Sequence, residues 1–308
     1  MNSEMFTVPQ GHRIYGMQLP VQAQSAYFVA DWERTAGPHE LAMLAKACDE
    51  SGFAYVGVCD HVALPESVAG GMGTHWADPI ATLSWIAGMT SKVGLLSHVY
   101  VLPYRNPRVA AKQFATLDHL SDGRAFIGIG AGHAQAEFEL LGIDFHNRGK
   151  ALDSGIPELA MLLENEFVNG FGARPLPTQS PRPPIWVAGS SPAAIKRAAR
   201  LGDGWLPQGP SDAGMIHILN DEWARIGRHV ENFMIGHITP FLYIGEPTFD
   251  VGEATLTGSA QSIAERILAG TASGVNQLQV RFKAQSCQEL CDQIAAFAAE
   301  VAPFVTTI

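Results

Sequence analysis

The chain has 308 residues, of which 47% are hydrophobic and 16% charged, and this balance excludes a disordered, collagen-like or coiled-coil protein. Its 30 acidic and 20 basic residues give a net charge of −10 without any basic run, so nucleic acid and anionic membrane surfaces are poor partners. Four cysteines form no disulfide framework, and no signal-peptide pattern or long apolar run occurs. We therefore expect a soluble cytoplasmic protein, and its size favours an enzyme.

The chain alternates between short apolar segments and amphipathic segments. The apolar segments predict eight strands, at residues 14–19, 53–59, 93–101, 125–129, 185–188, 204–206, 233–244 and 277–282. Helical patterns follow them, with predicted helices at 38–51, 79–91, 133–166, 192–201, 212–230 and 287–301, and two more that begin after Asn106 and Ser259 and run at least through Leu117 and Ile267. Asp78, Asn106 and Ser191 each precede a proline and are predicted N-caps.

Regular alternation predicts a parallel sheet with helices packed on it. Eight units within about 300 residues match a (β/α)8 TIM barrel, and no linker divides the chain, so we predict a single domain over 1–308. A doubly wound sheet of six strands is the alternative if two of the predicted strands are wrong.

In a barrel of this kind, functional residues follow the carboxyl ends of the strands. Asp60 and His61 follow the second predicted strand, His98 and Val99 belong to the third, and His133 follows the fourth. Asp60, His61 and His133 are the candidate catalytic residues. Three imidazoles and a carboxylate could bind zinc. However, hydrolases of the amidohydrolase type carry His-x-His at the end of the first strand, where residues 16–19 contain no histidine, so we expect no metal.

Glycine-containing loops lie at the ends of the fifth and sixth predicted strands and precede helices, namely Ala188-Gly189-Ser190 and Gln208-Gly209-Pro210. Backbone N–H groups at helix N-termini bind anions, so these two loops predict a phosphate site. The long segments 61–77 and 245–258 could cover the pocket as lids.

The sequence contains neither a Gly-x-Ser-x-Gly elbow nor a phosphate-binding Walker loop. The run Gly128-Ile129-Gly130-Ala131-Gly132 lacks the third glycine of a dinucleotide-binding motif, because Gln135 stands at that position. Without a covalent nucleophile, a bound cofactor is expected to carry the chemistry.

Four further motifs carry a family resemblance: Leu-Pro-Tyr-Arg-Asn-Pro at 102–107, the run from Thr116 to Gly132, Glu137-Phe138 with Leu141-Gly142-Ile143, and Pro-Ile-Trp-Val-Ala-Gly-Ser-Ser at 184–191. In this order and spacing they resemble the luciferase-like monooxygenase superfamily. The resemblance covers about 41–205 and resumes weakly at 258–282. Val-Cys-Asp-His-Val-Ala-Leu-Pro at 58–65 is similar to the Asp-His signature of the branch that uses the deazaflavin coenzyme F-420.

That resemblance implies an oxidoreductase that moves a hydride between coenzyme F-420 and a small organic substrate. It places His61 near the deazaflavin beside Asp60, and it places a non-prolyl cis peptide at His98–Val99, backing the ring. Some members carry a glutamate acid where His133 stands, so His133 becomes the expected acid–base group. Trp76 is expected to cover the ring.

The phosphate end of the coenzyme would then lie against Ala188, Gly189, Ser190, Gln208, Gly209 and Pro210. Candidate partners for its anionic tail are Arg105, Arg108, Lys112, Arg148 and Lys150. We expect a homodimer. Three alternatives stay open: an FMN-dependent monooxygenase of the same superfamily, a TIM-barrel zinc hydrolase, and a flavin-binding protein without catalysis.

Overall fold

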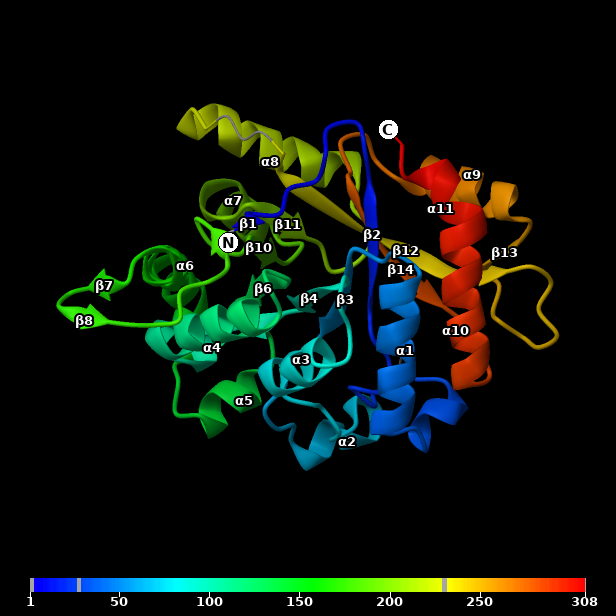
Figure 1. Ribbon diagram of the computed structural model, residues 1–308, viewed down its shortest axis with the longest axis horizontal. Coiled ribbons are helices and arrows are strands. Elements are labelled where there is room, and N and C mark those ends of the chain that lie inside the picture. The colour runs from blue at the N-terminus through cyan, green and yellow to red at the C-terminus, as the bar shows by residue number, and fades with distance from the viewer. Residues whose placement is uncertain (1–2, 27–28, 229–231, 308) are drawn as a thin grey trace.

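The computed structural model describes residues 3–26, 29–228 and 232–307. Its centre is a closed ring of eight parallel strands (Figure 1), which are β2 (Ile14–Gln18), β3 (Tyr55–Val58), β4 (Gly94–Ser97), β6 (Ala125–Gly130), β10 (Ile185–Ala188), β11 (Gly204–Leu206), β12 (Met234–Ile244) and β14 (Gln277–Phe282). The ring closes where β6 pairs with β10 and where β14 pairs with β2. The predicted TIM barrel is confirmed, and the six-stranded alternative is wrong.

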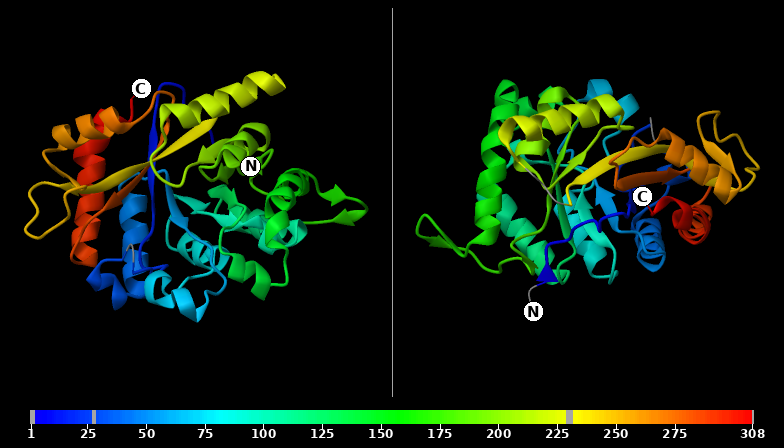
Figure 2. Two further views of the ribbon diagram at one scale, coloured as in Figure 1. Left: turned by 180° about the vertical axis from the view of Figure 1, so that it is seen from behind. Right: turned by 90° about the horizontal axis from the view of Figure 1, so that it is seen from above.

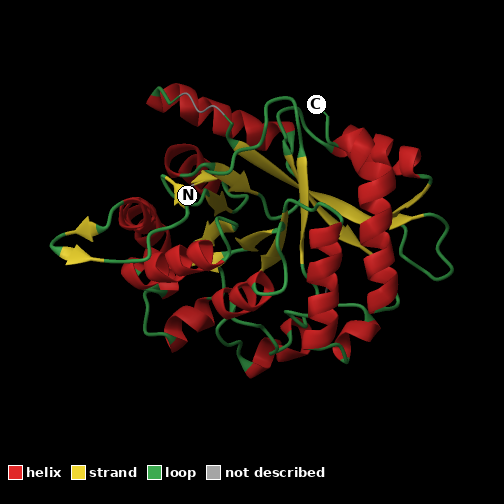
Figure 3. Cartoon of the chain, viewed as in Figure 1, coloured by secondary structure: helices red, strands yellow, loops and turns green. Residues whose placement is uncertain are grey.

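Helices surround the strands (Figures 2 and 3). They are α1 (Pro38–Glu50), α3 (Pro79–Ala87), α4 (Pro107–Leu120), α6 (Arg148–Glu164), α7 (Pro192–Leu201), α8 (Ala213–Ile226), α9 (Ala260–Gly270) and α10 (Cys287–Ala296). The predicted N-caps are confirmed, because Asp78, Asn106 and Ser191 each accept a hydrogen bond from a backbone N–H in the first turn.

Three predicted helices are clearly too long, and one of them, 79–91, ends at Ala87 as α3. The segment 133–166 divides into α5 (Gln135–Leu140), a 3-10 turn (Phe145–Asn147) and α6, because Asp144 caps a new turn by accepting from His146 N. Helix α8 ends at Ile226, where Gly227 takes a left-handed conformation with φ of 64°. The last two residues of the predicted helix, 229 and 230, lie outside the described residues.

The core has two parts. The larger one lies between strands and helices, and the smaller one fills the barrel interior with large side chains such as Tyr55, Phe126 and Trp186. Phe126 and Trp186 stack with their ring centroids 4.9 Å apart. The N-terminal segment adds Val8 to this inner cluster, and its strand β1 (Ser3–Glu4) pairs with β9 (Gln179–Ser180). The amino end of the barrel is therefore packed, and function is expected at the carboxyl end of the strands.

Several elements were not predicted. The segment 61–77 contains α2 (Glu66–Met72), and the third predicted strand continues past β4 as β5 (Tyr100–Val101) and a 3-10 turn, η2 (Leu102–Tyr104). The others are η1 (Asp31–Arg34), the hairpin β7 (Phe167–Val168) and β8 (Phe171–Gly172), β13 (Leu256–Gly258) and α11 (Ala302–Val305). The last five residues of the predicted helix 287–301 form a π-helical turn (Phe297–Val301). The hairpin projects from the body of the molecule (Figure 1).

Strand β12 is irregular near Pro240. Its register against β14 shifts between Ile238 and Phe241, which makes a β-bulge. Beyond β12, backbone hydrogen bonds join Gly245 and Gly258 in both directions, so the ends of the second long loop are held together. Among the described residues, no helix has the length and apolar character needed to cross a membrane.

Candidate active site

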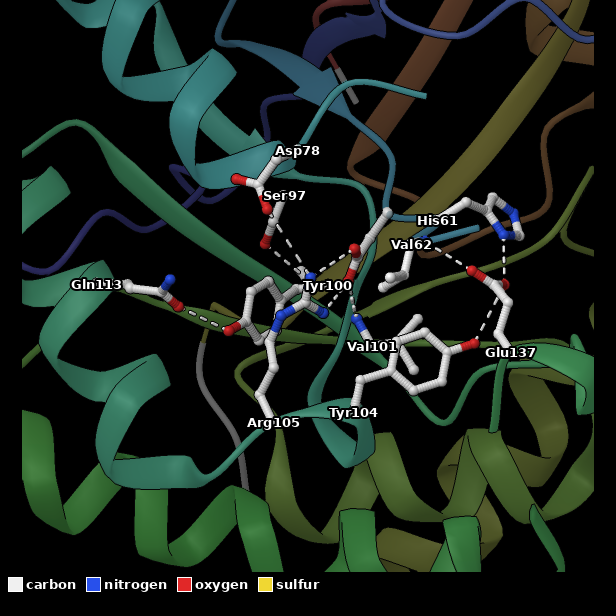
Figure 4. A network of polar contacts seen from close by, with 12 residues as sticks. His61, Val62, Asp78, Ser97, Tyr100, Val101, Tyr104, Arg105, Gln113 and Glu137 are labelled. Atoms are coloured by element: carbon white, nitrogen blue, oxygen red, sulfur yellow. Dashed lines mark hydrogen bonds and ion pairs between the residues drawn. The ribbon is translucent and has the colours of Figure 1, made fainter. Parts of the chain in front are cut away.

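Asp60 lies just beyond the carboxyl end of β3 and is only 4% exposed. Its two carboxylate oxygens accept from the Arg105 guanidinium at 2.5 and 2.8 Å, and one of them also accepts from Val101 N at 2.8 Å. Figure 4 shows Arg105 reaching back from beyond η2 toward β3. A bidentate pair of this kind fixes geometry, so Asp60 ties the end of β3 to the turn that follows β5.

His61, the next residue, is anchored by a different carboxylate. Its Nδ1 lies 2.7 Å from Oε2 of Glu137 on α5, and the other Glu137 oxygen accepts from Val62 N at 2.6 Å. The Tyr104 hydroxyl also donates to Glu137, at 3.2 Å (Figure 4). Burial would raise the pKa of Glu137, but hydrogen bonding and charge from His61 and the N–H groups of the loop lower it overall. Glu137 is therefore ionised, and its carboxylate holds the Nδ1 edge of the His61 ring in place.

The two anchors share one turn. Asp60 and His61 are consecutive, and so are Tyr104, which donates to Glu137, and Arg105, which donates to Asp60. With Nδ1 engaged, Nε2 is the second nitrogen of His61, and no described residue forms a hydrogen bond with it. The pairing fixes both the tautomer and the direction of the imidazole.

Two aromatic side chains stand beside His61. The Trp76 ring lies 4.4 Å from the His61 ring, centroid to centroid, and the His133 ring lies 5.5 Å away at 88°. Trp76 Nε1 is buried and has no hydrogen-bond partner among the described residues. Desolvation and the neighbouring His61 lower the pKa of His133. The structure thus brings three predicted residues, His61, His133 and Trp76, to one place.

His98 and Val99 follow β4, and the peptide bond between them is cis. This is the bond at which the resemblance places a cis peptide. His98 Nδ1 lies 3.2 Å from Oε1 of Gln18, and burial lowers the pKa of His98 to about 4, so its imidazole is neutral near pH 7. Any side chain at Gly57 would press on His98, since an added Cβ would lie 3.0 Å from the His98 Cβ.

The two predicted phosphate loops lie together. Ser190 Oγ accepts from Gln208 N at 2.8 Å, and Gly189 N donates to Leu206 O at 2.9 Å. Gly189 has φ of 123°, which side chains disfavour. Ala188 packs at the rim of the inner cluster, and Gly209 and Pro210 continue the second loop toward α8.

Four of the five basic side chains expected at the coenzyme tail have partners within the protein. Arg105 pairs with Asp60, which removes it from the candidates for a phosphate contact. Arg108 lies 4.0 Å from Glu158, Arg148 donates to the Gly132 and Phe145 carbonyls, Lys112 donates to the Arg174 carbonyl, and Lys150 is exposed.

The histidines and Asp60 do not form a metal centre. Within the described ranges, no group of three or more His, Cys, Asp or Glu side chains is arranged to hold a metal ion. Asp60 instead has Arg105 as its partner, and His61 has Glu137.

Sequence reasoning missed the partners rather than the central residues. Glu137, Tyr104 and Arg105 lie within motifs that carry the family resemblance, but their contacts join positions 33 to 76 residues apart. Their only signal is that buried charged side chains need partners.

Comparison with known proteins identifies the family. Residues 22–248 match the family model described as luciferase-like monooxygenase. The chain belongs to this family. Among solved structures, this luciferase-like chain superposes on monooxygenase RslO1 from Streptomyces bottropensis with a TM-score of 0.72 and 20% identity, covering 94% of this chain and 99% of the other.

The coenzyme F-420 dependent tetrahydromethanopterin reductase from Methanopyrus kandleri superposes with a TM-score of 0.66 and 19% identity, over 94% of this chain and 99% of the other. At these identities the likeness shows the fold.

Several curated relatives of this luciferase-like chain carry F-420 in their names. It is 33% identical to an F-420-dependent glucose-6-phosphate dehydrogenase of Kineococcus radiotolerans over 180 residues, which are 55% of this chain and 52% of the relative. It is 31% identical to an F-420-dependent hydroxymycolic acid dehydrogenase of Mycobacterium tuberculosis over 179 residues, 54% of this chain and 48% of the relative. The chain therefore spans about half the length of the curated relatives it matches.

Proposed function

We propose that this protein is an oxidoreductase that transfers a hydride between coenzyme F-420 and a small organic substrate. The observation that carries the proposal is His61, which follows β3 and is held by Glu137 with Nε2 left for a ligand. The F-420-dependent relatives, which match about half of the chain, support the choice of coenzyme.

The residues at the carboxyl end of the barrel fit such a coenzyme. The buried Trp76 Nε1 is a donor in need of an acceptor, and flavin-type rings carry acceptors at their edges. The loops at Gly189-Ser190 and Gln208-Gly209, which precede α7 and α8, suit the phosphate end. His98 and Val99 would lie behind the ring. When bound, the deazaflavin supplies or accepts the hydride.

The chain's own residues would orient the reacting groups and hold or release the proton. His61 would direct Nε2 to the reacting centre, while Asp60 holds the backbone of its loop through Arg105. His133 would hold or release a proton at its ring, because its lowered pKa keeps a neutral population near pH 7. Glu137 and Asp60 act as positioning residues, since their oxygens are occupied by protein donors.

Titration with F-420 and with FMN, followed by fluorescence, tests the proposal. Saturable binding of F-420 alone is expected. Saturable binding of FMN alone, with oxygen consumption by the reduced complex, would contradict it and favour a monooxygenase. The predicted homodimer is a separate proposal, which sedimentation velocity tests.

A further inference from the structure

Strand β14 carries a row of polar side chains into the barrel. Gln277 contacts the hydroxyl of Tyr55, which belongs to the inner cluster, so this face of β14 points to the barrel interior. Alternate residues of a strand share a face. Gln279 and Arg281 therefore follow Gln277 along the interior, and Arg281 stands at the carboxyl end, where the candidate active site lies.

A second cation continues this row. Lys283 N donates to Leu242 O at 3.0 Å, so the ladder with β12 extends past the end of β14. The Arg281 guanidinium carbon lies 4.5 Å from the centroid of the Phe241 ring, and the Lys283 ammonium lies 4.2 Å from it. Two cations thus share the ring of Phe241.

Neither cation is matched by a close anion. Among the described residues, no carboxylate lies within 4.0 Å of Arg281 or Lys283. Arg281 Nε donates to the Thr239 carbonyl, and Lys283 acts on the buried Glu33 from a longer distance. An aromatic face attracts cations but carries no net charge. The pair is therefore positive in a protein whose net charge is −10.

We propose that Arg281, Lys283 and Phe241 form an anion-binding site for the substrate, which is then a small organic carboxylate or phosphate ester. The proposal rests on the proposed function, since it assigns the anion to the substrate rather than to the coenzyme. The ring order of strands supports this assignment, because β12 separates β14 from β11 and the phosphate loops.

Calorimetric titration with inorganic phosphate and with acetate, at constant ionic strength in chloride, tests the site. Wild type is expected to bind one or both anions, and the probe bound more tightly indicates phosphate ester or carboxylate. Arg281→Gln and Lys283→Gln should each weaken binding about tenfold, since charge-assisted hydrogen bonds are the strong ones. Arg266→Gln, which removes an exposed cation from α9, is the matched control and should leave binding unchanged.

Parallel titration of each variant with F-420 separates the two proposals. Unchanged F-420 affinity with lost anion binding supports a substrate site. Loss of F-420 affinity in Lys283→Gln, with competition between phosphate and F-420, would assign the cations to the coenzyme and overturn the inference. Absence of anion binding by wild type would also overturn it. Anion binding without any F-420 binding would leave the site standing and reject the proposed function. Lys283→Gln decides the outcome if Arg281→Gln fails to fold.

Discussion

The carboxyl ends of β3 and β14 lie at the same end of the barrel, but the charged side chains there are paired differently. At β3, Asp60 and Glu137 are nearly fully buried and are matched by Arg105, His61 and backbone N–H groups. At β14, Arg281 and Lys283 share an aromatic ring and have no close carboxylate among the described residues. A matched network holds a side chain in place before any ligand arrives, whereas unmatched charge is best stabilised by a ligand.

The largest effect on the reaction is expected from removing His61, the side chain that the network at the end of β3 holds. His61→Ala should lower the rate of F-420-linked hydride transfer by roughly 100-fold or more, the usual contribution of a positioned acid–base group. Stopped-flow absorbance of the coenzyme measures the rate, and fluorescence checks that it still binds. His119→Ala, at an exposed position on α4, is the control. An unchanged rate in the His61 variant would reject its role.

Breaking the Asp60 pair should cost stability instead. Asp60→Asn leaves the guanidinium of Arg105, whose side chain is 19% exposed, with only the exposed Asp78 carboxylate at 4.0 Å. The loss expected for an unmatched buried partner is about 3–5 kcal/mol in the free energy of unfolding. Urea denaturation measures it. Asp31→Asn breaks a pair with Arg34 at the surface and should change little, so equal losses in the two variants would contradict the prediction.

Glu137→Gln keeps the shape of the anchor and removes its charge. Because Val62 N and His61 both donate to this carboxylate, about 1–3 kcal/mol of stability should be lost. The signature of positioning is spectroscopic: ¹⁵N shifts of the His61 ring should report one tautomer in wild type and a mixture in the variant. A single unchanged tautomer would mean that Glu137 only packs.

Stability should also fall in mild acid because of His98. Its pKa is about 4 when folded and 6.5 when exposed. Between these values the unfolded chain binds more protons, so stability decreases as pH falls, by up to about 1.4 kcal/mol per pH unit. Urea denaturation from pH 7 to pH 5 measures the slope. His98→Asn should flatten it, and an equal slope in the variant would assign the effect to other groups.

The smallest effect is expected at the carboxyl end of β14, where Arg281 and Lys283 have no close carboxylate among the described residues. Phe241→Leu removes the ring shared by Arg281 and Lys283, and a cation–π contact at such a site is worth about 0.5–1 kcal/mol. Phosphate affinity should therefore fall about threefold in calorimetry. The control is Phe167→Leu, because this ring is exposed on the β7–β8 hairpin. A loss as large as that of Lys283→Gln would make Phe241 a direct ligand contact.

Local patterns were enough to predict the barrel. All eight strands and the three capped helix starts follow from alternation and from pairs such as Asn106-Pro107, because each depends on a few neighbouring residues. Helix α2 was missed because its own residues include Gly70 and Gly71, which indicate a loop. The short strand β13 forms only through pairing with β12.

The site was predictable in part for the same reason. His61, His98 and the two glycine loops follow strands, so position along the chain indicates them. Their partners come from distant parts of the chain that the closed barrel brings together. Glu137 contacts His61 although 76 residues separate them, and Phe241 on β12 lies opposite Arg281 on the adjacent strand β14. No local pattern contains a contact of that range. The inward direction of Arg281 also needs the neighbouring strand to be known.

The bulge at Pro240 changes which residues of β12 face the barrel interior. Before it, Gly236 and Ile238 stand opposite Gln277 and Gln279 on the interior face, and after it Phe241 stands opposite Arg281. One additional residue thus moves the interior face from even to odd positions. In an unbroken strand, Leu242 would point into the barrel and Phe241 would face the helices. A single proline, which cannot donate to the ladder, therefore decides which side chain the two cations meet.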